Sequence, residues 1–174
     1  MLADRPALKA LALALNLPEA TRRGVQLRNQ LGPLPAVAAD RTRLLQVLGN
    51  LVGNAVKFNH DGGWVELRGA VEGPWLRLDV VDGGPGVAPE QLPRLFQPFE
   101  RLDAEARGIA GTGLGLATSR RLVEAMQGRI EARGTPGSGL TVSLRLPLGG
   151  AAPAAPERLQ GRVAYVEDNE TNVE

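Results

Sequence analysis

The sequence predicts a two-layer α/β sandwich, in which a mixed, mostly antiparallel sheet of about five strands carries helices on one face. Three observations predict this class. Segments with alternating hydrophobicity outnumber helical segments, and most of them follow one another through short turns, as the strands of hairpins do. The helical segments are amphipathic on one side only, so one contact layer is enough to bury them.

The first half of the chain is expected to hold two helices and three strands. Residues 6–23 have the apolar spacing of a helix, and residues 24–31 alternate as a strand does. Asp40 is a suitable N-cap for a helix over residues 41–58. Two strands follow, joined by a turn at residues 72–74. Their alternating apolar residues are Val65, Leu67 and Val71 in the first strand and Leu76, Leu78 and Val80 in the second.

The second half begins with a glycine- and proline-rich stretch over residues 82–102, with room for one short helix. The last helix begins at a glycine motif near residue 111, and Gly128 is expected to end it. Residues 129–133 and 140–148 alternate again. They are therefore expected to form two further strands, joined by "GTPGSG".

The composition excludes several classes of function. The chain has 20 basic and 19 acidic residues and no long basic run, so neither nucleic acid nor an anionic membrane is indicated as a partner. It has no cysteine, which excludes disulfides and thiol chemistry and fits the cytoplasm. No signal peptide is evident, and the longest apolar run is too short to span a bilayer. We therefore expect a cytoplasmic fragment, whose parent can still be membrane-anchored.

The helix expected over residues 41–58 carries polar chemistry along one edge. Asn50, Asn54 and Lys57 follow the spacing i, i+4, i+7, which places them beside an apolar arc. Amide oxygens are suitable ligands for Mg²⁺, and a lysine beside them suits phosphate oxygens. An ordinary solvated helix edge has the same pattern, so the helix alone leaves both interpretations open.

Two glycine-rich turns supply further candidates. Asp82 ends a strand before "GGPG", where a carboxylate can accept a hydrogen bond from a ligand, although an ordinary Asp-Gly turn looks the same. Gly111, Gly113 and Gly115 precede a helix, where backbone N–H groups favour an oxyanion. A flexible loop before a helix is the alternative. The Rossmann and Walker A patterns both fail, because Leu116 stands where the first needs glycine and no Gly-Lys-Ser/Thr follows for the second.

Four segments occur in a characteristic order. They are "NLVGNAVKF" at 50–58, "DGGPG" at 82–86, "LFQPFERL" at 95–102 and "GTGLGL" at 111–116. Over about residues 20–148 they resemble the N, G1, F and G2 boxes of the ATP-binding catalytic domain of sensor histidine kinases, within the GHKL ATPase superfamily. Four boxes in order are far more specific than any one of them.

The resemblance implies ATP and Mg²⁺ as cofactors. Asn54 would hold Mg²⁺, Asn50 and Lys57 would lie near the phosphates, and these three would form the catalytic set with Arg101, a phosphate or transition-state contact. Asp82 would accept a hydrogen bond from the adenine amino group. Phe58 and Thr141 would lie near the adenine, and Gly84 and Gly86 would shape the turn after Asp82. Phe99, with Phe96, would anchor the start of a lid over residues 100–112. The residues around the triphosphate would be Gly111, Thr112, Gly113, Leu114, Gly115 and Leu116.

The resemblance also favours phosphoryl transfer over hydrolysis. The ATPase members of the superfamily have a glutamate that activates water where this chain has Asn50, which cannot act as a base. The γ-phosphoryl group would instead pass to a histidine on a dimerisation domain outside this chain, and from there to a receiver domain. His60, the only histidine, follows the long helix in a turn-like segment. It is not expected to be the acceptor, so the chain is not expected to phosphorylate itself.

Three parts are expected: a catalytic domain over residues 1–148, a linker over 149–160, and the truncated start of a receiver domain over 161–174. In the last part Glu167 and Asp168 follow a short hydrophobic run, as the acid pair of a receiver does, and a solvated acidic end is the alternative. At the other end, "MLADRPALKAL" is either a linker from the dimerisation domain or the first helix.

The sequence departs from the family pattern at several places. Gly83 stands where the family often has asparagine, "FNHDGG" replaces the commoner ending of the first box, and the lid is short. Two rival functions remain open. One is a non-catalytic module that binds nucleotide or a partner for regulation, and the other is a serine-directed kinase or ATPase of the same superfamily.

Overall fold

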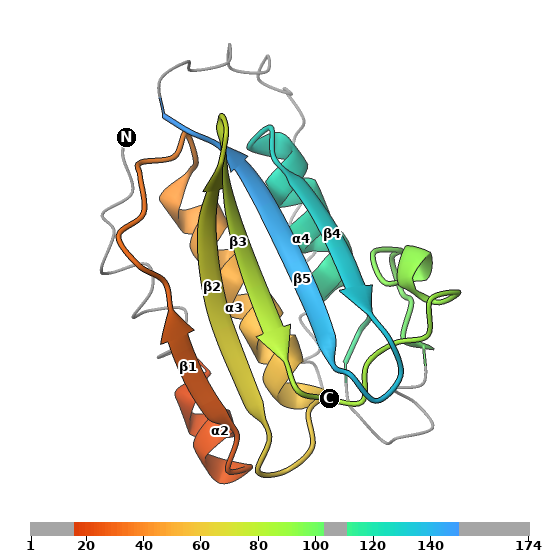
Figure 1. Ribbon diagram of the computed structural model, residues 1–174. Helices are drawn as coiled ribbons and strands as arrows, with labels where there is room; N and C mark the ends of the chain where they lie inside the picture. Colours follow the sequence, from red (N-terminus) through yellow and green to blue (C-terminus); the bar gives the residue numbers. More distant parts are fainter. Residues whose placement is uncertain (1–15, 103–110, 150–174) are drawn as a thin grey trace, which may run out of the picture.

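Five strands form one sheet in the order β1-β2-β3-β5-β4, and helices cover one of its faces (Figure 1). The computed structural model describes residues 16–102 and 111–149. β1 pairs with β2 in parallel, whereas the other neighbouring strands pair antiparallel. The predicted two-layer sandwich is therefore confirmed. The strands are β1 (Gln26–Gln30), β2 (Trp64–Glu72), β3 (Trp75–Asp82), β4 (Arg129–Gly134) and β5 (Leu140–Pro147).

The helix α3 (Arg41–Lys57) packs against the sheet and against α4 (Gly115–Ala125). As predicted, Asp40 is its N-cap, and the carboxylate accepts a hydrogen bond of 2.9 Å from the Arg43 N–H. Each large apolar side chain that the helix buries contributes roughly 1.5–3 kcal/mol, so its buried arc holds the two layers together. The arc consists of Leu44, Val47, Leu48, Leu51, Val52, Ala55 and Val56.

In the part of the chain that the structure describes, the N-terminal elements are one helix and one strand. A helix is confirmed at α2 (Leu17–Arg22), and residues 6–15 of the predicted helix lie outside the described residues. The strand predicted over 24–31 is β1. A short 3-10 helix, η1 (Leu92–Arg94), fills the place predicted for a short helix. Among the described residues, no helix has the length and apolar character needed to cross a membrane.

The predicted strands β2 and β3 both bury alternating side chains, with one exception. Val65 and Leu67 of β2 are buried, as are the alternating residues of β3. Val71 is 54% exposed although it follows the same alternation. It lies directly beside the end of the hairpin, where it pairs with Leu76. Alternation therefore identified the strand but not how deeply each residue is buried.

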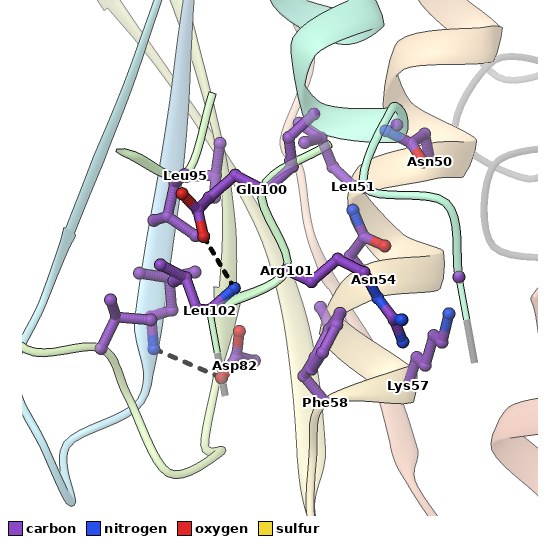
Figure 2. Close-up of a pocket in the computed structure, with 18 of the residues that line it drawn as sticks. Asn50, Leu51, Asn54, Lys57, Phe58, Asp82, Leu95, Glu100, Arg101 and Leu102 are labelled. Carbon is purple, nitrogen blue, oxygen red and sulfur yellow. Dashed lines mark hydrogen bonds between the residues drawn. The ribbon is translucent and has the colours of Figure 1, made fainter. Parts of the chain in front are cut away.

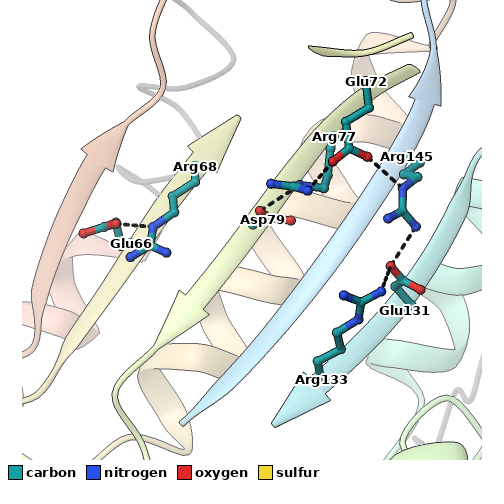
Figure 3. A network of polar contacts seen from close by, with 8 residues as sticks. All are labelled: Glu66, Arg68, Glu72, Arg77, Asp79, Glu131, Arg133 and Arg145. Carbon is teal, nitrogen blue, oxygen red and sulfur yellow. Dashed lines mark hydrogen bonds and ion pairs between the residues drawn. The ribbon is translucent and has the colours of Figure 1, made fainter. Parts of the chain in front are cut away.

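The face of the sheet opposite the helices carries ion pairs (Figure 3). Arg145 on β5 donates to Glu72 on β2 at 3.2 Å and to Glu131 on β4 at 2.7 Å. Arg77 on β3 also binds Glu72, as well as Asp79. These pairs are partly buried. Their main consequence is that this face stays polar, which fixes which side of each strand faces the helices.

The end of α4 differs from the prediction. Gln127, not a glycine, takes the left-handed conformation with φ of 57°. Its N–H donates to the Glu124 carbonyl and the Gly128 N–H donates to the Val123 carbonyl, both at 2.9 Å, which is the Schellman arrangement. Gly128 is needed for a different reason, since a Cβ there would lie 2.6 Å from the Arg145 carbonyl oxygen on β5.

We predict that Gln127→Gly stabilises the protein by about 0.5–1 kcal/mol. A left-handed conformation costs a non-glycine residue about 1–2 kcal/mol, and the greater freedom of glycine in the unfolded chain offsets part of this gain. Urea unfolding followed by circular dichroism measures the change. Gln127→Ala is the control, because it removes the same side chain but keeps the Cβ. Equal free energies of unfolding for the two variants would contradict the prediction, because the left-handed conformation at position 127 would then cost a non-glycine residue nothing.

Candidate functional site

A cavity of about 310 Å³ lies between α3, the end of β3 and the segments on either side of residues 103–110 (Figure 2). Its apolar walls include Leu51, Val80, Leu95, Leu140 and Val142. Most of the predicted site residues line the same cavity, which brings together four segments far apart in the sequence. They are Asn50, Asn54, Lys57, Phe58, Asp82, Gly86, Arg101, Gly111, Thr112, Gly113, Gly115 and Leu116.

Four predicted site residues are not part of this lining. Thr141 lies on β5 between two residues that do line the cavity, so the alternation of the strand turns its side chain to the other face. The side chains of Phe99 and Leu114 are exposed, by 75% and 38%. Gly84 is buried in the turn after Asp82, and its N–H donates to the Asp82 carboxylate at 2.9 Å.

One edge of α3 presents Asn50, Asn54 and Lys57 to the cavity (Figure 2). Asn50 is held by a second helix, because its Nδ2 donates to the Ser119 hydroxyl at 2.8 Å. The Asn50 Oδ1 then faces the start of α4, where a Cβ on Gly115 would lie only 2.5 Å away. The third glycine of the motif is therefore required by the approach of this amide.

Two basic side chains meet at the same end of the cavity. The side chain of Arg101 extends from its loop toward the edge of α3 that carries Asn54 and Lys57 (Figure 2). A Cβ on Gly111 would lie 2.8 Å from the Lys57 Nζ, so the glycine motif passes directly beside this ammonium group. Two cations and a glycine-rich backbone at one place favour the binding of an anion.

The segment before the undescribed residues 103–110 packs against the glycine motif. The Phe99 N–H donates to the Gly113 carbonyl at 3.1 Å, and a Cβ on Gly113 would lie 2.8 Å from the Phe99 backbone. Glu100 accepts hydrogen bonds from the Leu102 N–H at 3.1 Å and from Arg94 at 2.9 Å. These hydrogen bonds lower the pKa of Glu100, and the bond from the Leu102 N–H has the largest effect. The segment is thus held in place by backbone contacts.

Asp82 lies at the end of β3, at the side of the cavity away from the basic residues (Figure 2). Its Oδ1 accepts hydrogen bonds from the Gly84 N–H at 2.9 Å and the Leu140 N–H at 3.3 Å. Burial raises the pKa of Asp82, and the two backbone bonds oppose this effect without cancelling it. Asp82 is thus a partly desolvated acceptor that borders the cavity.

The departure at Gly83 has a structural reason. A Cβ at this position would lie 2.5 Å from the Nε1 of Trp64, so the indole fills the space that a side chain would need. The Trp64 carbonyl accepts a hydrogen bond from the Gly83 N–H at 3.1 Å. The guanidinium of Arg28 lies 5.3 Å from the centre of the Trp64 ring, a cation–π distance. The turn after Asp82 is therefore supported by β2.

Three residues important for the site were missed by the sequence analysis. Asn59 is 3% exposed and donates to the Trp64 carbonyl at 2.9 Å, and its place directly after the first box could have revealed it. Ser119 follows Gly115 by one helical turn and could have been found from that spacing. Arg23 bonds to the C-terminal end of α3, and no local pattern indicates it.

Comparison with known proteins gives one family model, that of the histidine kinase-, DNA gyrase B-, and HSP90-like ATPases, which matches residues 39–150. The sensor protein TorS of Escherichia coli (strain K12) is 40% identical over 141 residues, which cover 77% of this chain and 15% of that protein. The signal transduction histidine-protein kinase BaeS of the same organism is 36% identical over 127 residues, which cover 72% of this chain and 27% of that protein.

Among solved structures, full-length ShkA in complex with AMPPNP is similar to this chain with a TM-score of 0.75 and 35% sequence identity. The match covers 88% of this chain and 32% of that one. The chain thus spans 15% to 32% of these three longer proteins. The similarity therefore concerns one part of each relative.

We predict that Asp82→Asn makes the protein more stable at pH 7, by on the order of 1 kcal/mol. Because the pKa of Asp82 is raised in the folded state, the wild-type free energy of unfolding falls as pH rises from the ordinary aspartate pKa through the raised one. Above that window the charged carboxylate is a cost that asparagine lacks. Below about pH 3 the carboxyl group is mostly protonated in both states, and the difference should disappear.

Urea unfolding at several pH values between about 3 and 7 measures this difference. Glu90→Gln is the control, since Glu90 is exposed and its replacement should leave stability unchanged at every pH. An Asp82→Asn variant that is less stable than the wild type at pH 7 would contradict the prediction. So would a gain in stability that does not depend on pH.

Proposed function

The chain belongs to the histidine kinase-, DNA gyrase B- and HSP90-like ATPase family, and we propose that it is the ATP-binding catalytic domain of a hybrid sensor histidine kinase. One observation carries this proposal. One cavity is lined by the polar edge of α3, by Asp82 and by the glycine motif at 111–115. Its hydrogen-bond acceptor, Asp82, lies at the side away from the two cations, Lys57 and Arg101 (Figure 2). The histidine kinase among its relatives and the AMPPNP complex of ShkA support it. The hybrid assignment rests on Glu167 and Asp168, outside the described residues.

ATP fits the distribution of charge in the cavity in one direction. Asp82 would accept a hydrogen bond from the adenine amino group, and the apolar side chains of Val80, Leu140 and Val142 would contact the adenine ring. The triphosphate would lie toward Lys57 and Arg101, whose charges neutralise it, with backbone N–H groups of the glycine motif beside it. Phosphoryl transfer needs mainly such positioning and charge neutralisation.

The polar residues of the site fit a Mg²⁺ ion held together with the phosphates. Within residues 16–102 and 111–149, no group of three or more histidine or acidic side chains lies close enough to bind a metal ion. An ion would therefore depend on an amide oxygen of Asn54, on phosphate oxygens and on water, a ligand set that suits Mg²⁺. When bound, the ion would offset charge on the phosphates.

Transfer to a protein histidine is favoured over hydrolysis. Asn50 occupies the position of the glutamate that activates water in ATPase relatives, and an amide cannot take a proton from water. The γ-phosphoryl group would leave ADP and bond to a histidine nitrogen of the dimerisation domain in the parent protein, and then pass to a receiver aspartate. Phe99 and Leu114 are exposed beside cavity-lining residues, and supply an apolar surface for that domain to contact.

The decisive experiment is phosphorylation of the parent's dimerisation domain, supplied separately with Mg²⁺ and ATP. We expect acid-labile phosphohistidine on that domain, and a loss of at least about tenfold in its rate of formation with Lys57→Ala. Labelling followed by acid and base treatment measures this. Bound ATP without label would indicate a regulatory module. Acid-stable phosphate, or steady ATP turnover by the chain alone, would indicate a serine-directed kinase or an ATPase.

Asn54→Ala tests the proposed metal ligand. We expect it to weaken ATP binding roughly tenfold in the presence of Mg²⁺, since one oxygen ligand is lost, and to leave binding in EDTA nearly unchanged. Calorimetric titration under both conditions measures the difference. Gln46→Ala is the matched control, because Gln46 lies on an exposed part of the same helix. An unaltered magnesium dependence in Asn54→Ala would remove this residue from the metal site.

A further inference from the structure

We propose that Arg23 is a positioning residue for ATP binding, which acts by fixing the C-terminal end of α3 and thereby the place of Lys57. Arg23 does not line the cavity. It follows α2 directly, where the chain turns toward β1. The inference rests on the proposed function, because it assumes that Lys57 contacts the phosphates of ATP.

The guanidinium of Arg23 binds three backbone carbonyls at the end of α3. Its Nη1 donates to the carbonyl oxygens of Val56 at 2.7 Å and Lys57 at 2.8 Å. Its Nη2 donates to the carbonyl of Asn59 at 2.8 Å. The Arg23 side chain is only 20% exposed, so these bonds are largely shielded from water. One side chain from another element therefore holds the last turn of the helix.

The helix needs this external cap. The last four carbonyls of an α-helix have no partner within the helix. α3 ends at Lys57, and its C-cap Phe58 is not followed by a left-handed residue as the C-cap of α4 is. A planar guanidinium can satisfy several carbonyls at once, and its charge is favourable at the negative end of the helix dipole. Arg23 thus takes the place of the Schellman arrangement that ends α4.

A second set of contacts holds the loop after α3 to the same residue. The Arg23 Nε donates to the Asp61 carboxylate at 3.0 Å, and the Gly62 N–H donates to the Arg23 carbonyl at 3.0 Å. Both the helix end and the loop are therefore bonded to Arg23. Together with the backbone N–H groups of Phe58 and Asn59, which donate to the carbonyls of Asn54 and Val56, Arg23 fixes the direction of the last turn of α3.

Lys57 is the site residue that this arrangement controls most directly. Arg23 binds the carbonyl of Lys57 itself, and the Lys57 ammonium lies so close to Gly111 that a single added Cβ would be 2.8 Å away. A small rotation of the last turn would move the ammonium out of this narrow space. Misplacement of a binding group by about 1 Å is enough to cost a large part of its effect.

The test compares Arg23→Gln with Arg22→Gln in calorimetric titrations with Mg·ATP. Arg22 is the adjacent residue, and its exposed side chain pairs with Glu19 on the surface, so its replacement should leave binding unchanged. Arg23→Gln should weaken ATP binding roughly tenfold. Arg23→Lys keeps the positive charge but lacks the planar guanidinium that reaches several carbonyls. Its affinity for ATP should lie between those of Arg23→Gln and the wild type. Titrations are made at a temperature where circular dichroism shows each variant to be folded.

A double mutant separates positioning from a general loosening of the fold. If Arg23 acts through Lys57, Arg23→Gln should weaken ATP binding by less than about twofold in a Lys57→Ala background, because the group it positions is already absent. Binding of adenosine, which has no phosphates, should change little. A tenfold loss in both backgrounds, with an equal loss for adenosine, would overturn the proposal.

The outcomes also distinguish this inference from the proposed function. A wild-type protein that does not bind ATP would overturn both. A wild-type protein that binds ATP, together with an Arg23→Gln variant that binds it equally well, would overturn the role of Arg23 alone. In that case the proposed ATP site would remain supported by the residues that line the cavity.

Discussion

The packing of α3 against the sheet is the constraint on which the site depends. Its buried arc fixes the rotation of the helix about its own axis, and this rotation decides that Asn50, Asn54 and Lys57 face the cavity. Because a helix is stiff, these three side chains cannot move independently of one another. The direction of the helix is then secured at its ends, by Asp40 at the first turn and by Arg23 at the last.

The sheet supplies the other half of the site through the ends of its strands. β3 ends at Asp82, and the turn that follows is bonded to β2 through the Trp64 carbonyl. The same carbonyl accepts from Asn59, which follows the last turn of α3. A single backbone oxygen therefore joins the segment that directly follows α3 to the turn that directly follows Asp82. The two ends of the cavity are connected by a short path of hydrogen bonds.

The sequence predicted those features that depend on neighbouring residues. The apolar arc of α3 and its cap at Asp40 follow from a period and a spacing within one helix, and the cavity-lining residues follow from four short boxes. Contacts between distant segments could not be predicted in this way. Arg23 and Val56 are 33 positions apart, and Asn50 and Ser119 are 69 apart. Likewise, the close approach of Gly128 to the Arg145 carbonyl on β5 could not be predicted from the helix alone.

Several unfavourable features of the structure lie around the cavity. Asp82 is a carboxylate whose pKa is raised by burial, and Lys57 and Arg101 bring two positive charges to one place. Among the described residues, Phe99 and Leu102 account for two of the three non-glycine residues with positive φ. Strain and desolvation of this kind persist where a ligand offsets them. A ligand with a hydrogen-bond donor at one end and several negative charges at the other would bond to the desolvated acceptor and lie beside both cations.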